Sequence, residues 1–128
     1  NTAANWNADM IHFDSAGTQV QSVVANPAFQ GLTTNHWYRW EIDFDLNTNL
    51  ITELRLTDLT TSTTSVDNPV GWYMFGGAAS APSPTGFRFF SGGGVAGNTL
   101  CFDNPRIVPK PGIGDVVYYK FGGGCGDR

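Results

Sequence analysis

The sequence has few charged residues. Asp, Glu, Lys and Arg make up only 14% of its 128 residues, and glutamate and lysine each occur twice. Good helix formers are therefore scarce, while threonine, asparagine and 16 glycines supply most of the polar and turn-forming character. This composition excludes a helical bundle or a coiled coil, and it disfavours a chain that alternates strands with helices.

Positive charge and long apolar runs are also lacking. The net charge is -4 at pH 7 and no basic stripe is present, so we expect neither a nucleic acid nor an anionic membrane surface as a partner. No apolar run is long enough to suggest a membrane span. The chain opens at Asn1 rather than Met, and we expect a processed product or a fragment. Its Thr-, Asn- and Gly-rich composition is typical of a secreted or cell-surface protein.

Cysteine occurs only at Cys101 and Cys125. This spacing fits no metal-binding motif. Two cysteines allow one disulfide, within one chain or between two chains, and two unrelated thiols are the alternative. A bridge within the chain would contribute about 3 kcal/mol to the free energy of unfolding in the chain-entropy model.

The dominant pattern that is present has a period of two residues, which is typical of β-strands. Its clearest run covers residues 37–46, and residues 50–59 return after an Asn-Thr-Asn turn. The apolar face of the first run carries Tyr38, Trp40, Ile42, Phe44 and Leu46. The opposite, acidic face carries Trp37, Arg39, Glu41, Asp43 and Asp45. In the returning run, strict alternation places Ile51 on the same side as Glu53 and Arg55.

Shorter runs of the same kind predict further strands. A hairpin is expected around residues 10–14 and 18–24, with His12 on its polar face, and residues 60–68 read as a polar loop or an edge strand. Other expected strands cover residues 72–75, 87–90, 99–108 and 115–121. Roughly eight to ten short strands without a helix predict an all-β, antiparallel sandwich of two sheets.

Two segments resemble a known family. Residues 36–61 (HWYRWEIDFDLNTNLITELRLTDLTT) resemble the central hairpin of bacterial laminin-G-like, concanavalin A-like jelly-roll modules. Residues 97–108 (GNTLCFDNPRIV) resemble the closing strand of these modules, with Pro105 in place of the usual Val. The resemblance extends over about residues 10–108 and implies a concanavalin A-like jelly roll, but it says little about function.

The tail resembles the opening strand of the same modules. Residues 114–128 read GDVVYYKFGGGCGDR, so we divide the chain into a sandwich (1–108), a Pro/Gly linker (109–114) and a terminal strand (115–128). In the family the first and last strands are neighbours in one sheet. The terminal strand could complete its own sandwich, pass to a neighbouring subunit or open a second module. The segment that would then mediate assembly consists of Val116, Val117, Tyr118, Tyr119, Lys120 and Phe121.

The acidic row of residues 41–45 is the strongest catalytic candidate. Some jelly-roll glycosidases carry Glu-Ile-Asp-x-x-Glu on one strand, which aligns a nucleophile and an acid on one face. Here Glu41 and Asp43 match the start of that pattern, but Leu46 stands where the final Glu would be. We therefore expect no catalytic residue, and a solvated row paired with Arg39 and Arg55.

The metal and histidine candidates are also weak. Asp45, Asn47 and Asn49 alternate oxygen ligands as in calcium loops, but the same pattern makes an ordinary turn. Calcium bound by loop carbonyls elsewhere is a second possibility, and no other cofactor is expected. His12 and His36 form no recognisable catalytic or metal-binding spacing.

Exposed aromatic rings offer a possible carbohydrate site. Trp6, Trp37 and Tyr73 could stack on sugar rings, whereas Trp40 and Trp72 are expected in the core. The sequence thus favours a non-enzymatic, extracellular, bacterial structural or adhesive module, whose partners are copies of itself or a neighbouring module. A carbohydrate-binding module is the alternative, and a glycoside hydrolase fragment using Glu41 and Asp43 is a distant third.

Overall fold

The architecture is described from a computed structural model, which covers residues 5–79, 96, 99–109 and 116–123. Its elements in chain order are β1 (Asn5–Trp6), β2 (Met10–Phe13), β3 (Gln19–Ser22), η1 (Pro27–Phe29), β4 (Leu32–Thr33), β5 (Tyr38–Asp45), β6 (Leu50–Asp58), β7 (Thr63–Asp67), η2 (Gly77–Ala79), β8 (Asp103–Pro109) and β9 (Val116–Gly123). The two η elements are single turns of 3₁₀ helix. Within the described residues the chain is mostly β, as the sequence predicts. Within the described ranges, no helix is long and apolar enough to cross a membrane.

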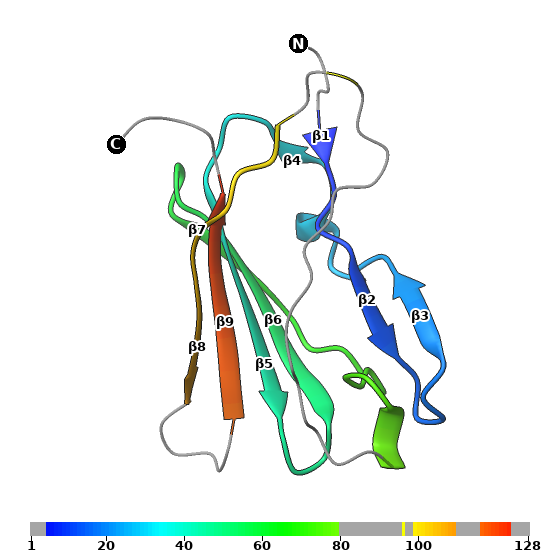
Figure 1. Cartoon of the computed structure of the whole chain (residues 1–128). Helices are drawn as coiled ribbons and strands as arrows, with labels where there is room; N and C mark the ends of the chain where they lie inside the picture. The colour runs from blue at the N-terminus through cyan, green and yellow to red at the C-terminus, as the bar shows by residue number, and fades with distance from the viewer. Residues whose placement is uncertain (1–4, 80–95, 97–98, 110–115, 124–128) are drawn as a thin grey trace.

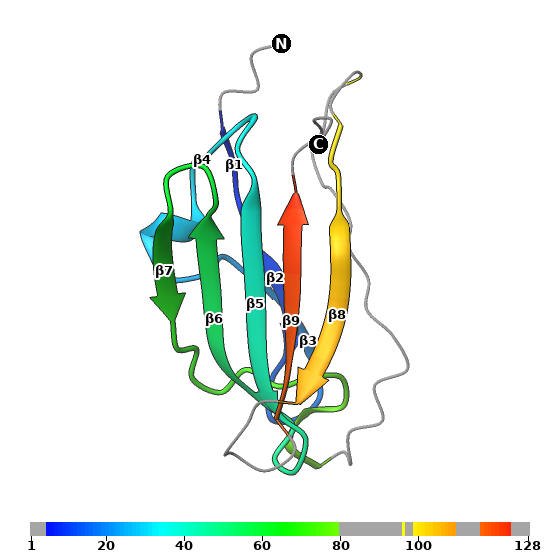
Figure 2. The same cartoon turned by 90° about the vertical axis from the view of Figure 1, so that its left-hand side faces the viewer.

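Five strands form one antiparallel sheet in the order β7-β6-β5-β9-β8 (Figure 2). Strand β9 comes last in the chain but lies between β5 and β8. Its backbone pairs with β5 over the whole length of both strands, from Tyr38 opposite Gly123 to Asp45 opposite Val116. The terminal segment therefore occupies an interior position of this sheet.

A second, smaller layer lies against one face of the sheet (Figure 1). It contains the β2–β3 hairpin, the short β1–β4 ladder and η1. Phe29 and Val24 from this layer pack with Phe44 and Leu54 from the sheet, and all four are buried. The prediction of antiparallel β structure is thus confirmed, whereas the connectivity of a jelly roll stays a prediction.

The side chains of β5 alternate between the core and the opposite face of the sheet, as the sequence predicts. Tyr38, Ile42 and Phe44 are buried in the core, and Trp40 packs against it. The ring of Phe29 meets the Trp40 ring edge to face, with the ring centroids 5.7 Å apart. This apolar row fixes which face of the sheet is inside, because a shift of one residue would turn the whole row toward solvent.

The alternation in β6 is broken, so the predicted orientation of Ile51 is wrong. Asp43 pairs with Glu53, but the next residue, Phe44, pairs with Ile51, which leaves Thr52 as an extra residue in β6. The Thr52 hydroxyl donates to the Asp43 carbonyl at 3.2 Å. This β-bulge turns Ile51 into the core, away from the face that carries Glu53.

Several predicted boundaries shift, and one predicted strand is wrong. Residues 72–75 form no strand, and Tyr73 instead makes isolated bridges to Phe13 and Leu50. Residues 63–67 form an edge strand, one of the two alternatives for this Thr-rich segment. Pro109 ends β8 rather than starting a linker. The strand expected at residues 87–90 and the rest of the linker lie outside the described residues.

Candidate functional site

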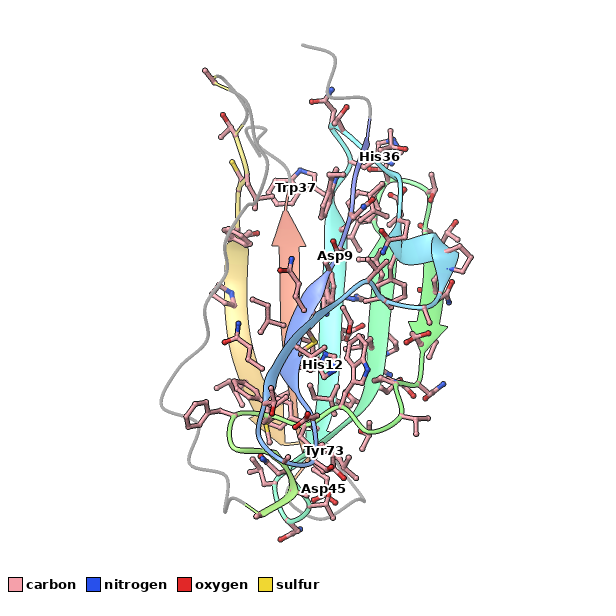
Figure 3. All side chains as sticks on the ribbon, turned by 90° about the vertical axis from the view of Figure 1, so that its right-hand side faces the viewer. Asp9, His12, His36, Trp37, Asp45 and Tyr73 are labelled. Carbon is pink, nitrogen blue, oxygen red and sulfur yellow. The ribbon has the colours of Figure 1, made fainter. Side chains whose placement is uncertain are left out.

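The three aromatic residues predicted to bind sugar do not form one platform. Trp37 and Tyr73 lie at opposite ends of the molecule (Figure 3). Trp6 is half-buried and meets the Tyr38 ring edge to face, with centroids 5.4 Å apart. Trp6 therefore contributes to packing at the end of the molecule where β5 begins.

Tyr73 connects the two layers. Its N–H donates to the Phe13 carbonyl and its carbonyl accepts from the Phe13 N–H, both at 2.8 Å. The neighbouring Trp72 carbonyl accepts from Ile51 N–H in β6 at 2.9 Å. The segment around Tyr73 thus links the β2–β3 hairpin to the large sheet through backbone hydrogen bonds.

The acidic row of β5 is paired with arginine, but it is not fully solvated. Arg55 Nη2 donates to Asp43 Oδ1 at 3.0 Å, and Arg39 Nε donates to Glu41 Oε2 at 3.2 Å. The side chain of Asp43 is only 1% exposed, so the prediction of a solvated row is wrong at this position. Asp43 lies on a central strand, between β6 and β9, and the Arg55 side chain of β6 contacts its carboxylate.

Arg55 is the centre of this charged group. Its Nη1 lies 3.1 Å from Glu53 Oε1, and its Nε lies 3.9 Å from Glu41 Oε2. One guanidinium therefore neutralises carboxylates on its own strand and on β5. Carboxylates held in this way stabilise the sheet through charge and hydrogen bonding.

The residues predicted to bind calcium form hydrogen bonds within a turn and with its neighbouring loop. Asp45 Oδ1 accepts from Asn47 N–H at 2.8 Å, and Oδ2 accepts from the Thr48 hydroxyl at 3.0 Å. The hydrogen bond from Asn47 N–H is the main cause that lowers the pKa of Asp45 below its usual value. Among the described residues, no cluster of three or more His, Cys, Asp or Glu side chains could hold a metal ion.

Asn49 points into the adjacent loop. Its buried side-chain amide donates to the carbonyls of Met74, Phe75 and Gly77, the last at 2.6 Å. Its backbone has a φ of 63°, in the left-handed region that asparagine tolerates better than most residues. Asn49 therefore closes the turn and fixes the loop that contains Gly77, and the calcium site at Asp45, Asn47 and Asn49 stays a prediction.

His12 is buried, so its predicted place on a polar face is wrong. It is 5% exposed, and its ring stacks on Trp72 with centroids 4.0 Å apart and planes 3° from parallel. Burial lowers the pKa of His12 below its usual value, and the negative charge of Asp14 opposes this effect. Its Nδ1 has no hydrogen-bond partner in the part of the chain that the structure describes.

His36 belongs to a second polar group, at the end where β5 begins. Its Nδ1 lies 2.7 Å from Asp58 Oδ2, and Asp58 Oδ1 accepts from the N–H groups of Thr60 and Thr61. Burial acts to raise the pKa of Asp58, but the hydrogen bonds from His36, Thr60 and Thr61 outweigh it and hold the pKa below its usual value. The Asp58 carboxylate is therefore ionised and fixed at neutral pH.

A cleft of about 250 Å³ lies beside Asp58, between the two layers. Tyr38, Leu56 and Ser65 line it from the large sheet, and Gln30 and Thr33 line it from the segment around η1 and β4. The sequence does not predict this cleft, because Tyr38 is expected in the core and residues 60–68 as a polar loop or an edge strand, and neither expectation points to a hollow. The alternation of Thr63 and Ser65 along β7 was the available signal.

The backbone at the end of the β8–β9 ladder bears on the predicted disulfide. Asp103 pairs with Gly122, so the ladder ends close in sequence to both Cys101 and Cys125. Cys101 does not carry a free thiol. Cys125 lies outside the described residues, so its bridge to Cys101 stays a prediction.

Comparison of the chain with models of known families, with curated proteins and with solved structures finds no match.

Proposed function

We propose that the chain is a non-catalytic structural or adhesive module of an extracellular bacterial assembly, and that copies associate by exchange of strand β9. The observation that carries this proposal is the position of β9, which comes from the end of the chain and lies between β5 and β8. A strand in this position can come from the same chain or from a neighbouring copy with identical backbone pairing. Head-to-tail exchange would produce an open polymer.

The backbone register of β9 suits a strand that is inserted as a whole. Each residue from Val116 to Gly123 has a partner in β5, and Lys120 lies opposite Glu41 of β5 and Arg106 of β8. On its other side β9 pairs with β8, the segment that resembles a closing strand. The pairing of an opening-type strand with a closing-type strand supports the jelly-roll resemblance and the same proposal.

The charged face supports a non-catalytic role. Asp43 and Glu41 both form ion pairs with arginine, and Asp43 is buried. A retaining glycosidase needs two carboxyl groups on opposite sides of a substrate bond, one of them able to give up a proton. Carboxylates fixed by Arg39 and Arg55 suit a structural network better than proton transfer.

The proposal is tested by the mass of the full chain in solution. We expect light scattering after size-exclusion chromatography to show polymers that grow with protein concentration. A synthetic peptide of residues 115–128, added in excess during refolding, should shorten them by filling the slot between β5 and β8. The control peptide carries Tyr119→Pro, which removes a backbone N–H from the strand that pairs with β5 and β8 and should not shorten the polymers.

The cysteines supply an independent readout. If β9 is exchanged and Cys101 bonds Cys125, each bridge joins two chains, and non-reducing electrophoresis shows a ladder that reductant collapses. If β9 stays in its own chain, the bridge is intramolecular. A monomer at all concentrations, with or without reductant, contradicts the proposal.

A further inference from the structure

The two outer strands of the large sheet, β7 and β8, are protected differently against pairing with a further strand (Figure 2). Backbone groups along an outer strand are open to such pairing unless something covers them. Strand β8 contains Pro105 and Pro109, which lack an N–H, and its pairing with β9 is irregular between Asp103 and Arg106. Strand β7 reads Thr-Thr-Ser-Val-Asp over residues 63–67, with neither proline nor a basic residue. The sequence of β7 alone therefore leaves its edge open.

A side chain from the residue before η1 covers the β7 edge at one point. Asn26 Nδ2 donates to the Val66 carbonyl at 2.7 Å. In an antiparallel outer strand, alternate residues point both backbone groups toward the sheet, and the residues between them point both groups away from it. The Val66 carbonyl reaches a side chain outside the sheet, so Val66 is one of the outward residues and Thr64 is another. Within the described ranges, nothing else outside the sheet is hydrogen-bonded to the backbone of these two residues.

The orientation of the Asn26 amide is fixed by η1. Its Oδ1 accepts from the Ala28 N–H at 3.0 Å, and the Asn26 carbonyl accepts from the Phe29 N–H at 3.0 Å. Phe29 is completely buried, so this single turn is anchored in the core. The opposite orientation of the amide would bring its NH2 group against the Ala28 N–H and its oxygen against the Val66 carbonyl. The Asn26 amide is therefore held with its donor on the β7 edge.

The composition of β7 suits pairing with a second copy of the same strand. Thr63, Thr64 and Val66 are β-branched and favour extended backbone. In an antiparallel pairing about a twofold axis through Ser65, the outward residues Thr64 and Val66 lie opposite each other, as backbone hydrogen bonding between the two strands requires. Asp67, the one charged residue of the strand, then lies opposite the Thr63 hydroxyl rather than another carboxylate.

From these contacts, we propose that Asn26 prevents the β7 strands of two copies from pairing. Its side chain occupies the position beside Val66 that a second β7 strand needs. Without this contact, two copies join through a twofold contact into one continuous sheet. The inference does not rest on the exchange of β9, because β6 and β5 lie between β7 and β9.

The test variant is Asn26→Ser in the full chain. Serine also caps the start of a helical turn, so the hydrogen bond from Ala28 N–H is kept, but its short side chain does not reach the Val66 carbonyl. Residue-resolved hydrogen exchange with mass spectrometry reports on the outward amides of Thr64 and Val66. In the original chain, we expect both amides to exchange rapidly at every protein concentration. In Asn26→Ser, their exchange should slow by at least about tenfold as concentration rises over about a hundredfold range.

A second substitution shows whether the backbone of β7 makes the new contact. Thr64→Pro, added to Asn26→Ser, removes an outward N–H without removing a hydrogen bond between β7 and β6. We expect the Val66 amide of this double variant to exchange rapidly again at every concentration. If the double variant does not fold, Thr64→Lys replaces Thr64→Pro, because a lysine on an outer strand opposes pairing with another chain.

The outcomes separate this inference from its alternatives. Rapid exchange at Thr64 and Val66 in Asn26→Ser at every concentration overturns it. Slow exchange that does not depend on concentration contradicts it too, because a segment of the same chain would then occupy the edge. Protection gained at Ile107 in β8 as well would show that β7 pairs with β8 rather than with itself. A monomeric original chain contradicts only the exchange of β9, since the readout at β7 compares one variant with the original chain at one edge.

Discussion

Asp43 and Arg55 form an ion pair across two neighbouring strands, with 3.0 Å between Oδ1 and Nη2, and the Asp43 side chain is almost completely buried. Removing the charge of Asp43 leaves part of the Arg55 guanidinium without its most buried partner. We expect Asp43→Asn to lower the free energy of unfolding by about 1–3 kcal/mol, because an unsatisfied buried group costs about that much. Urea denaturation measures this change.

Glu53 provides the matched control. It also contacts Arg55, at 3.1 Å, but its side chain is 28% exposed. Exposed pairs contribute little, so Glu53→Gln should cost less than about 1 kcal/mol. Equal losses in the two variants would mean that burial does not decide the strength of these pairs.

Part of this structure follows directly from sequence periodicity. The apolar row of β5 predicts both the strand and its buried face, because the nine residues 38–46 alternate without interruption and Asn47 and Asn49 supply the turn that follows. An edge strand is one of the two expectations for residues 60–68, since most of their side chains are polar, and residues 63–67 form it. Long and regular patterns leave few alternative registers.

Other features depend on contacts between residues far apart in the sequence. His12 alternates with apolar residues and so looks exposed, but Trp72 stacks on it from another part of the chain. Ile51 is turned inward by an extra residue, Thr52, and a pattern of period two cannot foresee such a bulge. The central position of Asp43 likewise depends on β9, whose backbone pairs with β5 from more than seventy residues later in the sequence.

The candidate cleft was hidden for the same reason. Its floor and its opposite wall come from segments whose contact depends on how η1 and β4 pack against the sheet. The sequence directed attention to exposed tryptophans, whereas the cleft is lined by Tyr38 and by the hydroxyl side chains of β7.

The buried His12 predicts how stability depends on pH. Burial lowers its pKa in the folded chain, whereas the unfolded chain has an ordinary value of about 6.5. As the pH falls below 6.5, the unfolded chain therefore binds a proton that the folded chain resists, and the free energy of unfolding decreases. The decrease ends once the pH is below the folded pKa. Chemical denaturation between pH 8 and pH 4 measures this curve.

The variant His12→Phe isolates this contribution. Phenylalanine keeps an aromatic ring against Trp72 and does not titrate. We expect its free energy of unfolding to change less than that of the original chain as the pH falls from 7 to 5. Asp58, whose pKa is also lowered, contributes in a separate range below its own usual value, where acid removes its charge. Parallel curves for both proteins between pH 7 and 5 would show that His12 is not the group responsible.

Two variants of Asn49 should separate the stability that comes from its side-chain hydrogen bonds from the stability that comes from its backbone conformation. Asn49→Gly keeps the positive φ accessible but removes the amide that donates to the Met74, Phe75 and Gly77 carbonyls, so we expect a loss of about 1–3 kcal/mol in the free energy of unfolding. Asn49→Ala removes the same hydrogen bonds and adds the strain of a left-handed backbone, about 1 kcal/mol more. Thermal and urea denaturation of the two variants give both numbers.

Asn35 is the control for the backbone part of this prediction. It has almost the same φ, 62°, but it is exposed and makes no side-chain hydrogen bond within the described residues. Asn35→Ala should therefore cost about 1 kcal/mol relative to Asn35→Gly, and Asn35→Gly itself should be almost neutral. If Asn49→Gly is as neutral as Asn35→Gly, the three carbonyl contacts do not stabilise the loop. If Asn49→Gly lowers the free energy of unfolding and Asn35→Gly does not, the amide of Asn49 fixes the segment that joins the β2–β3 hairpin to β6. Loosening that segment should also raise the rate of hydrogen exchange at the Tyr73 amide.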